Sequence, residues 1–578
     1  MSNVLDIIGP IMIGPSSSHT AGAARLGRIA RTLLGEEPSS ARIALYGSFA
    51  KTYQGHGTDR ALVAGILGFA ADDVRLRDAL DIAAARGLAV SFDDSDAESG
   101  DVRHPNTARL ELAGASGAHV DVLGSSVGGG AILVTQIDGM AVHVTGQHAT
   151  CIVLHRDAPG LIAAVTDALA ETGVNICDFH LSRERRGGRA VMAIEVEGDL
   201  DANVAVRIGG LDGVLSAIVL PPVTDAGGET ASSADEATGR DESGVGLADA
   251  DGAPEFDFDS LADVVAAARA AGMSISEVVL AQQAAAMELP AAALYEQMRA
   301  RLRVMDACIE PGCDPELRST SGLTGGAAAR ERAAVEGGSA LSGGLLSAAL
   351  YRALAVSELN AAMGRIVAAP TAGSCGILPA AVLAMRDERG CSEHACVMSL
   401  FTAAAVGLVI ERNASLAGAE GGCQAECGSA AAMAAAALVE LAGGTPEQAA
   451  AAVSTAIQNV LGLVCDPVAG LVEIPCIKRN ASGVAGALVA AELALAGIPS
   501  EIPADEAIAA MRRVGTAMPA ALRETAEGGL AVTPSARVMA GRVFGRGGAG
   551  MGNDGAGIGD TPAGQTAALS CAVCNACR

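Results

Sequence analysis

Tryptophan is absent from this chain of 578 residues, and aromatic residues amount to only 2% of it. Half of the residues are nevertheless hydrophobic, so the cores must be built from aliphatic side chains, with helices packed closely through alanine and glycine. Lysine is also scarce: Lys51 and Lys478 are the only two among 39 basic residues. A pyridoxal cofactor needs a Schiff-base lysine, and neither lysine stands in a motif typical of pyridoxal enzymes.

Several classes of protein are excluded by what is missing. The longest apolar run, 395–410, is interrupted by Ser399 and Thr402 and is shorter than the roughly 20 residues that a membrane span needs. No basic stretch opens the chain, so no secretion signal is expected. The net charge is −27 without a basic cluster, which disfavours nucleic-acid binding. We therefore expect a cytoplasmic protein whose 14 cysteines serve as thiols or metal ligands rather than disulfides.

The chain divides into a mixed part, a compact unit and a connecting segment. Residues 1–147 alternate strand-like and helical runs, which predicts an α/β domain with loops at 103–106 and 124–130. Residues 148–222 follow the order strand, helix, strand, strand, helix, strand, the ferredoxin-like plan. Residues 223–258 are rich in acidic residues and glycine, which predicts a disordered linker.

Two further segments complete the chain. Residues 259–540 contain alanine-rich helical stretches broken by glycine and proline, which predicts an all-helical domain. Residues 541–578 form a glycine-rich tail that ends in Cys571-x-x-Cys574-x-x-Cys577. The fold class is therefore multidomain: α/β, ferredoxin-like and all-α in succession.

The 148–222 unit resembles an ACT domain, because Asp-x-Pro-Gly opens its first helix and Gly-Val-Asn-Ile precedes its second strand. Such domains usually bind amino acids as regulators. The resemblance implies an amino-acid effector, a homodimer, and regulatory roles for Asp157, Gly160, Asn175 and Ile176. A ferredoxin-like packing domain without a ligand remains the alternative.

Three cysteines of the helical region, Cys423, Cys465 and Cys476, stand beside turn-forming glycine or proline. A cubane iron–sulfur cluster normally takes four cysteines. Three would leave one iron free to bind substrate as a Lewis acid. The alternative is that these cysteines are buried apolar filler, a common role for this residue.

Hydroxyls and imidazoles gather in the N-terminal domain. The run from Ser16 to Thr20 places four hydroxyls and His19 before a predicted helix, a position that suits a carboxylate, whereas helix capping accounts for one hydroxyl only. His56 lies between two glycines, so a ligand can approach it closely. The helical domain has a single histidine, His394, in a loop without other site-like residues. An imidazole acid or base is therefore expected from the N-terminal domain, and the active site between domains.

Seven motifs, in order, are S-S-S-H-T, G-H-G-T-D, S-G-L-T-G-G, P-T-A-G-S, G-G-C-Q-A-E, C-D-P-V-A-G-L-V-E-I-P-C and K-R-N-A. They resemble those of the iron–sulfur-dependent L-serine dehydratases, and the resemblance covers nearly all residues outside the linker and tail. It implies a single-chain fusion in which the β part with its ACT domain precedes the α part. It also implies conversion of L-serine to pyruvate and ammonia with a [4Fe–4S] cluster, in amino-acid catabolism or gluconeogenesis.

The resemblance also implies roles for individual residues. Cys423, Cys465 and Cys476 would be the cluster ligands. The candidate catalytic residues are His19, His56 and Lys478. The candidate substrate-binding residues are Ser16, Ser17, Ser18, Thr20, Gly57, Thr58, Ser321, Gly322, Thr324, Thr371, Ser374 and Asn413.

Three points stay open at this stage. In some relatives a C-terminal cysteine enters the site as a removable fourth ligand, a part that Cys577, Cys574 or Cys571 could take; Cys375 and Cys427 are interpreted as packing residues. An amino-acid sensor that has lost catalysis is the alternative from another class. A dehydratase for threonine or another β-hydroxy amino acid is the closer alternative, because one methyl group changes binding by only about 1–3 kcal/mol.

Overall fold

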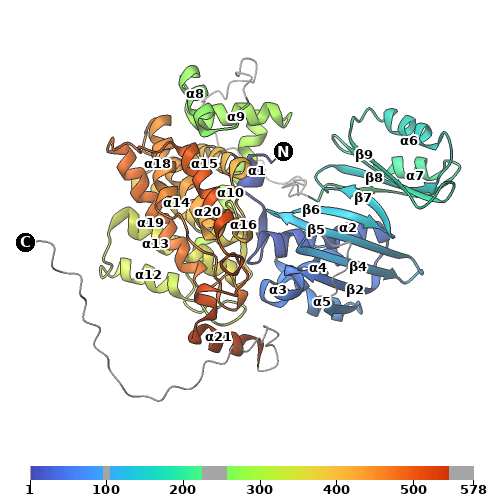
Figure 1. The fold of residues 1–578 in the computed structure, drawn as a ribbon, viewed down its shortest axis with the longest axis horizontal. Coiled ribbons are helices and arrows are strands. Elements are labelled where there is room, and N and C mark those ends of the chain that lie inside the picture. Colours follow the sequence, from blue (N-terminus) through green and yellow to red (C-terminus); the bar gives the residue numbers. More distant parts are fainter. Residues whose placement is uncertain (1, 95–103, 224–256, 546–578) are drawn as a thin grey trace, which may run out of the picture.

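The computed structural model describes residues 2–94, 104–223 and 257–545. Figure 1 shows two sheets on one side of the molecule and a helical domain on the other. Most of the expected acidic linker and tail lies outside the described residues. The described end of the linker is packed, since Phe258 is buried. Helix α21 continues to Phe544, so residues 541–544 of the predicted tail are helical.

A six-stranded sheet forms the N-terminal α/β domain, in the order β3-β2-β4-β5-β6-β7. Its strands are β2 (Pro38–Gly47), β3 (Ala89–Asp94), β4 (Asn106–Gly114), β5 (His119–Gly128), β6 (Ala131–Ile137) and β7 (Met140–Val144). Its helices are α2 (Ala23–Leu34), α3 (Ser48–His56), α4 (Thr58–Ile66) and α5 (Ala79–Ala85), with a 3₁₀ turn η2 (Val74–Asp78).

The prediction of a loop at 124–130 is wrong over its first part, because β5 continues to Gly128. Gly124 lies in the strand, and a Cβ there would stand 2.6 Å from Leu26 Cδ2. The glycine therefore serves close packing of α2 against the sheet, not a turn.

The ACT-like unit has its own sheet, in the order β11-β8-β10-β9, and a separate small core. Its elements are β8 (Ala149–Arg156), α6 (Leu161–Ala170), β9 (Ile176–Arg183), β10 (Arg189–Val196), α7 (Ala202–Gly209) and β11 (Val214–Leu220). This confirms the ferredoxin-like prediction.

Helices make up nearly all of the C-terminal domain. They are α8 (Leu261–Ala271), α9 (Ile275–Ala286), α10 (Ala291–Ala307), α11 (Ile309–Gly312), α12 (Ala327–Glu336), α13 (Gly344–Ala361), α14 (Ile377–Arg389), α15 (Glu393–Asn413), α16 (Gly418–Gly421), α17 (Ser429–Leu441), α18 (Pro446–Gln458), α19 (Cys476–Leu495), α20 (Ala504–Ala517) and α21 (Pro534–Phe544). The residues from Ala430 to Val439 in α17 are all buried, so alanine permits the close helix packing expected from the composition.

By length and composition alone, α15 could cross a membrane, and the bent pair α8–α9 passes the same test. The most apolar window of α15 is, however, 78% buried inside the protein. A core helix has these same properties, so the helix is weak evidence for a membrane.

One short strand corrects the all-helical prediction. β12 (Arg365–Val367) pairs antiparallel with β1 (Ile11–Ile13). Nearby, Arg301 Nε donates to the Ile8 carbonyl at 2.6 Å. A strand of three residues carries no alternation to recognise, and its partner lies more than 300 residues earlier. The N-terminal residues, including α1 (Val4–Ile7), are thus built into the helical domain.

Candidate active site

The three sequence-predicted cysteines lie at the ends of helical elements and are buried. Cys423 follows α16, Cys465 follows α18, and Cys476 begins α19. The thiols of Cys423 and Cys465 and a carboxylate oxygen of Glu426 all lie within 4.8 Å of one another. Cys476 is near enough for the charge of Cys423 to act on its thiol. The fold therefore brings the three predicted ligands to one place.

Arg479 supplies the positive charge at this place. Its Nη1 donates to Cys423 Sγ at 3.3 Å and to the Val464 carbonyl at 2.8 Å, and its Nη2 donates to Asp466 Oδ1 at 2.8 Å. Hydrogen bonds from Cys427 and Cys465, and then the Arg479 guanidinium, hold the pKa of the Cys423 thiol well below its usual range. One guanidinium thus joins the loops that carry two of the cysteines.

Two carboxylates accompany the thiols. Burial, then the charge of Cys423, raises the pKa of Glu524 to about 7, and burial raises that of Glu426 as well. A Cβ on Gly418 would stand 2.7 Å from Glu426 Oε2 and 3.4 Å from Cys465 Sγ, so only glycine leaves this space open. Three buried thiols, two half-buried carboxylates and one guanidinium therefore gather at this place, and the three thiols are the donor set. Such a set fits an iron–sulfur cluster held by cysteine.

On the side of the N-terminal domain, His19 is held by serines. It lies in a π-helical turn, η1 (Ser17–Gly22). Its Nδ1 contacts Ser16 Oγ at 3.2 Å and Ser18 Oγ at 3.1 Å, and its Nε2 contacts Ser48 Oγ at 3.1 Å. The backbone N–H of His19 also donates to Ser16 Oγ. Two of the predicted carboxylate-binding hydroxyls therefore orient this imidazole.

His56 ends α3 and is only 2% exposed. Neither of its ring nitrogens has a hydrogen-bond partner among the described residues, and the same is true of the Thr58 hydroxyl. Burial lowers the pKa of His56 to about 4; the nearby Gly470 carbonyl opposes this shift, although it does not reach hydrogen-bond geometry. Orphaned buried polar groups call for a ligand.

Gly470 belongs to η5 (Val468–Gly470), in the loop that joins Cys465 to Cys476. Gly57 has φ 69° and caps α3, and a Cβ there would stand 3.3 Å from Met363 Cε in the helical domain. Thr20 Oγ1 donates to the His56 carbonyl at 3.3 Å. His56 of the N-terminal domain therefore lies beside the loop that joins two predicted ligands in the helical domain.

Two predicted hydroxyl loops also reach this region. Thr324 Oγ1 donates to Glu473 Oε2 at 2.7 Å, and Glu473 stands three residues before Cys476. The hydroxyls of Thr371 and Ser374 share a 3.0 Å hydrogen bond. Burial raises the pKa of Glu426, and a hydrogen bond with the Thr371 side chain opposes this shift.

The remainder of the Ser321 loop is turn structure. Ser321 accepts from the Leu323 N–H at 3.1 Å, and Gly322 is exposed with φ 73°. Of the loop's predicted residues, the structure therefore connects Thr324 to the cysteine region.

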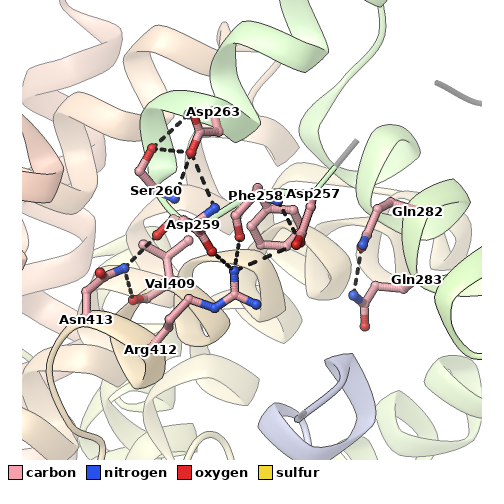
Figure 2. Close-up of polar contacts among 10 residues, drawn as sticks. All are labelled: Asp257, Phe258, Asp259, Ser260, Asp263, Gln282, Gln283, Val409, Arg412 and Asn413. Carbon is pink, nitrogen blue, oxygen red and sulfur yellow. Dashed lines mark hydrogen bonds and ion pairs between the residues drawn. The ribbon is translucent and has the colours of Figure 1, made fainter. Parts of the chain in front are cut away.

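Two predicted residues point elsewhere. Lys478 is exposed on α19, and its neighbour Arg479 contacts the thiol instead. Asn413 ends α15, where its Nδ2 donates to the carbonyls of Asp259 at 2.6 Å and Val409 at 3.0 Å, as Figure 2 shows. This amide fastens the start of the helical domain.

The other cysteines considered from the sequence have different surroundings. Cys375 is fully buried. Burial, and then the neighbouring Cys308, raises the pKa of its thiol, which agrees with a packing role. Cys427 is buried and contacts Cys423, so it lies closer to the site than a packing residue was expected to. The tail cysteines Cys571, Cys574 and Cys577 lie outside the described residues.

The predicted regulatory residues form the loops of the ACT-like unit. Asp157 accepts from Gly187 N and Arg183 Nη1, both at 2.9 Å. Gly160 precedes α6 with φ 87°. Asn175 Nδ2 donates to Glu197 at 2.8 Å, and Ile176 begins β9.

Sequence reasoning missed several site residues. Asp466 and Glu426 stand inside the quoted motifs, but no role was predicted for them. Ser48 follows a strand and carries no motif signal, and Glu524 lies far from every motif. Only their contacts in the fold reveal them.

Comparison with known proteins agrees with this arrangement. Residues 270–531 match the family model of the serine dehydratase alpha chain, residues 3–136 that of the beta chain, and residues 149–208 that of the ACT domain. An L-serine dehydratase of Streptomyces coelicolor is 33% identical over 547 residues, which cover 92% of this chain and 98% of the relative.

Two relatives from Bacillus subtilis each match one part. A probable L-serine dehydratase alpha chain is 52% identical over 251 residues, 43% of this chain and 83% of the relative. A probable beta chain is 42% identical over 213 residues, 37% of this chain and 95% of the relative.

Proposed function

Because the chain belongs to the serine dehydratase family, with beta-type, ACT and alpha-type parts in one polypeptide, we propose that it converts L-serine to pyruvate and ammonia. The observation that carries the proposal is the unpartnered, buried imidazole of His56, which faces the loop between Cys465 and Cys476. A proton acceptor from one domain thereby stands opposite a three-thiol site in the other.

Cys423, Cys465 and Cys476 would hold a [4Fe–4S] cluster, with Arg479 beside Cys423 to offset its charge. When bound, such a cluster supplies a Lewis acid for the serine hydroxyl, which is otherwise a poor leaving group. Whether Cys577 or Cys574 completes its coordination is left to experiment. Lys478 is exposed, so we assign it no catalytic role in place of Arg479.

The protein's own groups then bind the amino acid and move its proton. His56 is neutral at neutral pH, since burial lowers its pKa to about 4, and its free nitrogen accepts the α-proton of serine. His19, fixed by Ser16, Ser18 and Ser48, orients it by ring contact.

The buried Thr58 hydroxyl has no hydrogen-bond partner among the described residues, and it would bind the substrate carboxylate together with the Ser17 hydroxyl. Closure of the two domains over the site excludes water from the reacting atoms.

The remaining proposals follow the family. We assign residues 1–147, 148–222, 259–540 and 541–578 to the β-type, ACT, catalytic and tail segments, joined by the linker 223–258. We further infer a cytoplasmic homodimer that serves amino-acid catabolism or gluconeogenesis, with an amino-acid effector near Asp157, Gly160, Asn175 and Ile176.

Anaerobic purification with iron and sulfide analysis tests the proposal, followed by pyruvate release from L-serine before and after exposure to air. We expect about four irons per chain, the content of one cubane cluster, and pyruvate formation that is lost with the iron. Cys423→Ser, Cys465→Ser and Cys476→Ser should each lose the iron, while Cys375→Ser keeps it.

Iron-free protein that still forms pyruvate would overturn the proposal that catalysis depends on an iron–sulfur cluster. An intact cluster without turnover of L-serine would favour the amino-acid sensor. Faster turnover of L-threonine than of L-serine would identify L-threonine as the preferred substrate.

A further inference from the structure

A second group of metal-binding side chains lies in the ACT-like unit, in the part of the molecule opposite the helical domain (Figure 1). His148, Cys177 and Glu195 each offer a ligand atom, and these atoms all lie within 4.8 Å of one another. His148 immediately precedes β8, Cys177 lies in β9, and Glu195 lies in β10. No motif singled out by the sequence includes them.

A β-bulge brings the three together. Glu195 opposes Thr150 of β8 and Asp178 of β9, whereas Val196 opposes Ala149 and Ile176. Cys177 is therefore the extra residue of β9, inserted between two paired positions. Because a bulge re-aims the side chain at the insertion, the thiol turns toward the carboxylate of Glu195 on the neighbouring strand.

The carboxylate of Glu195 is buried without a cation. Its side chain belongs to a residue that is 3% exposed. It accepts from Thr145 N at 2.7 Å and from Thr145 Oγ1 at 3.0 and 3.1 Å, and no ion-pair partner for it occurs within the described ranges. The pKa of the Cys177 thiol is raised by burial, by Glu195 and also by a second carboxylate, Glu197, which therefore lies nearby. A buried charge held by neutral donors alone is costly, and a bound cation would remove that cost.

We propose that His148, Cys177 and Glu195 bind one divalent cation of the Zn²⁺ class. Imidazole, thiolate and carboxylate are the three ligand types that Zn²⁺ takes in proteins, and three protein ligands leave a fourth position for water or another donor. On binding, the Cys177 thiol releases its proton to solvent. Thr145 holds Glu195 in place as an outer-shell donor, the arrangement that orients metal-binding carboxylates.

The cysteines of the catalytic region lie in the helical domain, away from this site. Asp157 and Gly160 of the predicted effector region lie at the other end of β8, whereas Asn175 and Ile176 directly precede Cys177 and adjoin the site. The site stands where the six-stranded sheet meets the ACT-like sheet: the edge strands β7 and β9 approach there, and His143 Nδ1 contacts Asp178 Oδ2 at 3.2 Å. A bound cation would fasten the β7–β8 connection to β9 and β10.

Zn²⁺ binding to the full-length protein, with its iron in place, tests the proposal. A chromophoric chelator competes for Zn²⁺ under anaerobic conditions, and the stoichiometry of wild type is compared with Cys177→Ser and His148→Ala. We expect each variant to bind about one equivalent less than wild type. Thr145→Val should keep the equivalent but bind it roughly 10- to 100-fold more weakly, the usual effect of losing an outer-shell donor.

Cys391→Ser is the matched control, because Cys391 is a half-buried thiol in the helical domain whose sulfur donates to the Leu441 carbonyl at 3.8 Å. It should bind as wild type does, whatever other thiols contribute. Co²⁺ gives a second readout: its thiolate charge-transfer absorption should fall by one site in Cys177→Ser and not in Cys391→Ser. Equal stoichiometry and absorption in wild type and Cys177→Ser would overturn the proposal, whether or not the protein dehydrates serine.

Discussion

The imidazole rings of His19 and His56 meet edge to face, with their centroids 4.5 Å apart, yet the protein holds them in different ways. Ser16, Ser18 and Ser48 engage both nitrogens of His19, whereas both nitrogens of His56 lack a partner among the described residues. The engaged ring is suited to positioning and the free ring to accepting a proton.

Replacing His56 with asparagine should abolish most of the activity, because it removes the proposed proton acceptor. General-base catalysis contributes typically 10²- to 10⁴-fold, so kcat/KM for L-serine should fall by at least about 100-fold while iron content stays unchanged. His394→Asn is the control, since His394 is exposed and stacks near Tyr295 in the helical domain. A His56→Asn enzyme of normal activity would remove His56 from catalysis.

Acid should destabilise the folded protein through the same two histidines. Burial lowers the pKa of His19 and of His56, the latter from 6.5 to about 4, and the unfolded chain keeps ordinary values. Between about pH 6.5 and 4 the unfolded state therefore binds more protons, so stability is lost as the pH falls through this window, by up to about 1.4 kcal/mol per pH unit for each histidine. The groups facing His56 are His19 and the Gly470 carbonyl.

Thermal unfolding midpoints at pH 7.5 and 5.5 measure this effect. The decrease should be smaller in His56→Asn than in wild type and unchanged in His394→Asn. The same decrease in all three proteins would assign the acid sensitivity to other groups.

Much of the fold could be predicted because its signals are local. Strand-like and helical runs predicted the mixed character of the N-terminal domain, and the ferredoxin-like order followed from a short stretch of chain. The pairing of β1 with β12 could not be predicted, because the two three-residue strands gain their stability from a tertiary context that brings distant segments together.

The candidate site shows the same limit. Glycine and proline beside Cys423, Cys465 and Cys476 singled them out, and the structure gathers them. The sequence also favoured Lys478, since a cation near a thiolate is useful, but it could not say which of two adjacent cations faces inward. Helical geometry decides: Arg479, one turn after Cys476, points to Cys423, and Lys478 points outward.

Arg479→Gln should therefore impair retention of the metal site, whereas Lys478→Gln should not. The guanidinium contacts Cys423 Sγ, the Val464 carbonyl and Asp466 together, and losing a neighbour of this kind weakens metal binding roughly 10- to 100-fold. Arg479→Lys should restore little, because one ammonium cannot span acceptors on separate loops. Iron per chain after desalting is the measurement; loss of iron in Lys478→Gln but not in Arg479→Gln would reverse the assignment.

Thr324→Val should loosen the loop that precedes Cys476. The Thr324 hydroxyl donates to Glu473 at 2.7 Å, and Glu473 is only 4% exposed. An unsatisfied buried carboxylate costs about 1–3 kcal/mol, so the unfolding midpoint should fall and iron should be released faster to a chelator. Thr320→Val, at an exposed threonine of the same loop, should behave as wild type. Equal rates of iron release from both variants would show that Thr324 does not support the metal site.

Gly65→Ala tests how the two histidines are kept together. The helices that flank them, α2 and α4, touch through glycine: a Cβ on Gly65 would stand 2.0 Å from the Ala24 carbonyl oxygen, and one on Gly27 would stand 2.4 Å from that of Leu62. These atoms belong to backbone and cannot move aside locally, so the helices must separate.

Overpacking of this kind costs about 1–3 kcal/mol, and it should lower activity as well, because α2 continues from the turn that holds His19 and α4 begins two residues after His56. Gly486→Ala is the matched control: it lies inside α19 with no atom within 4 Å of the added Cβ, so it should gain up to about 1 kcal/mol from better helix propensity. Unfolding midpoints and kcat for both variants decide the matter. If Gly65→Ala matched wild type in midpoint and kcat, the close contact of α2 with α4 would not be what holds His19 against His56.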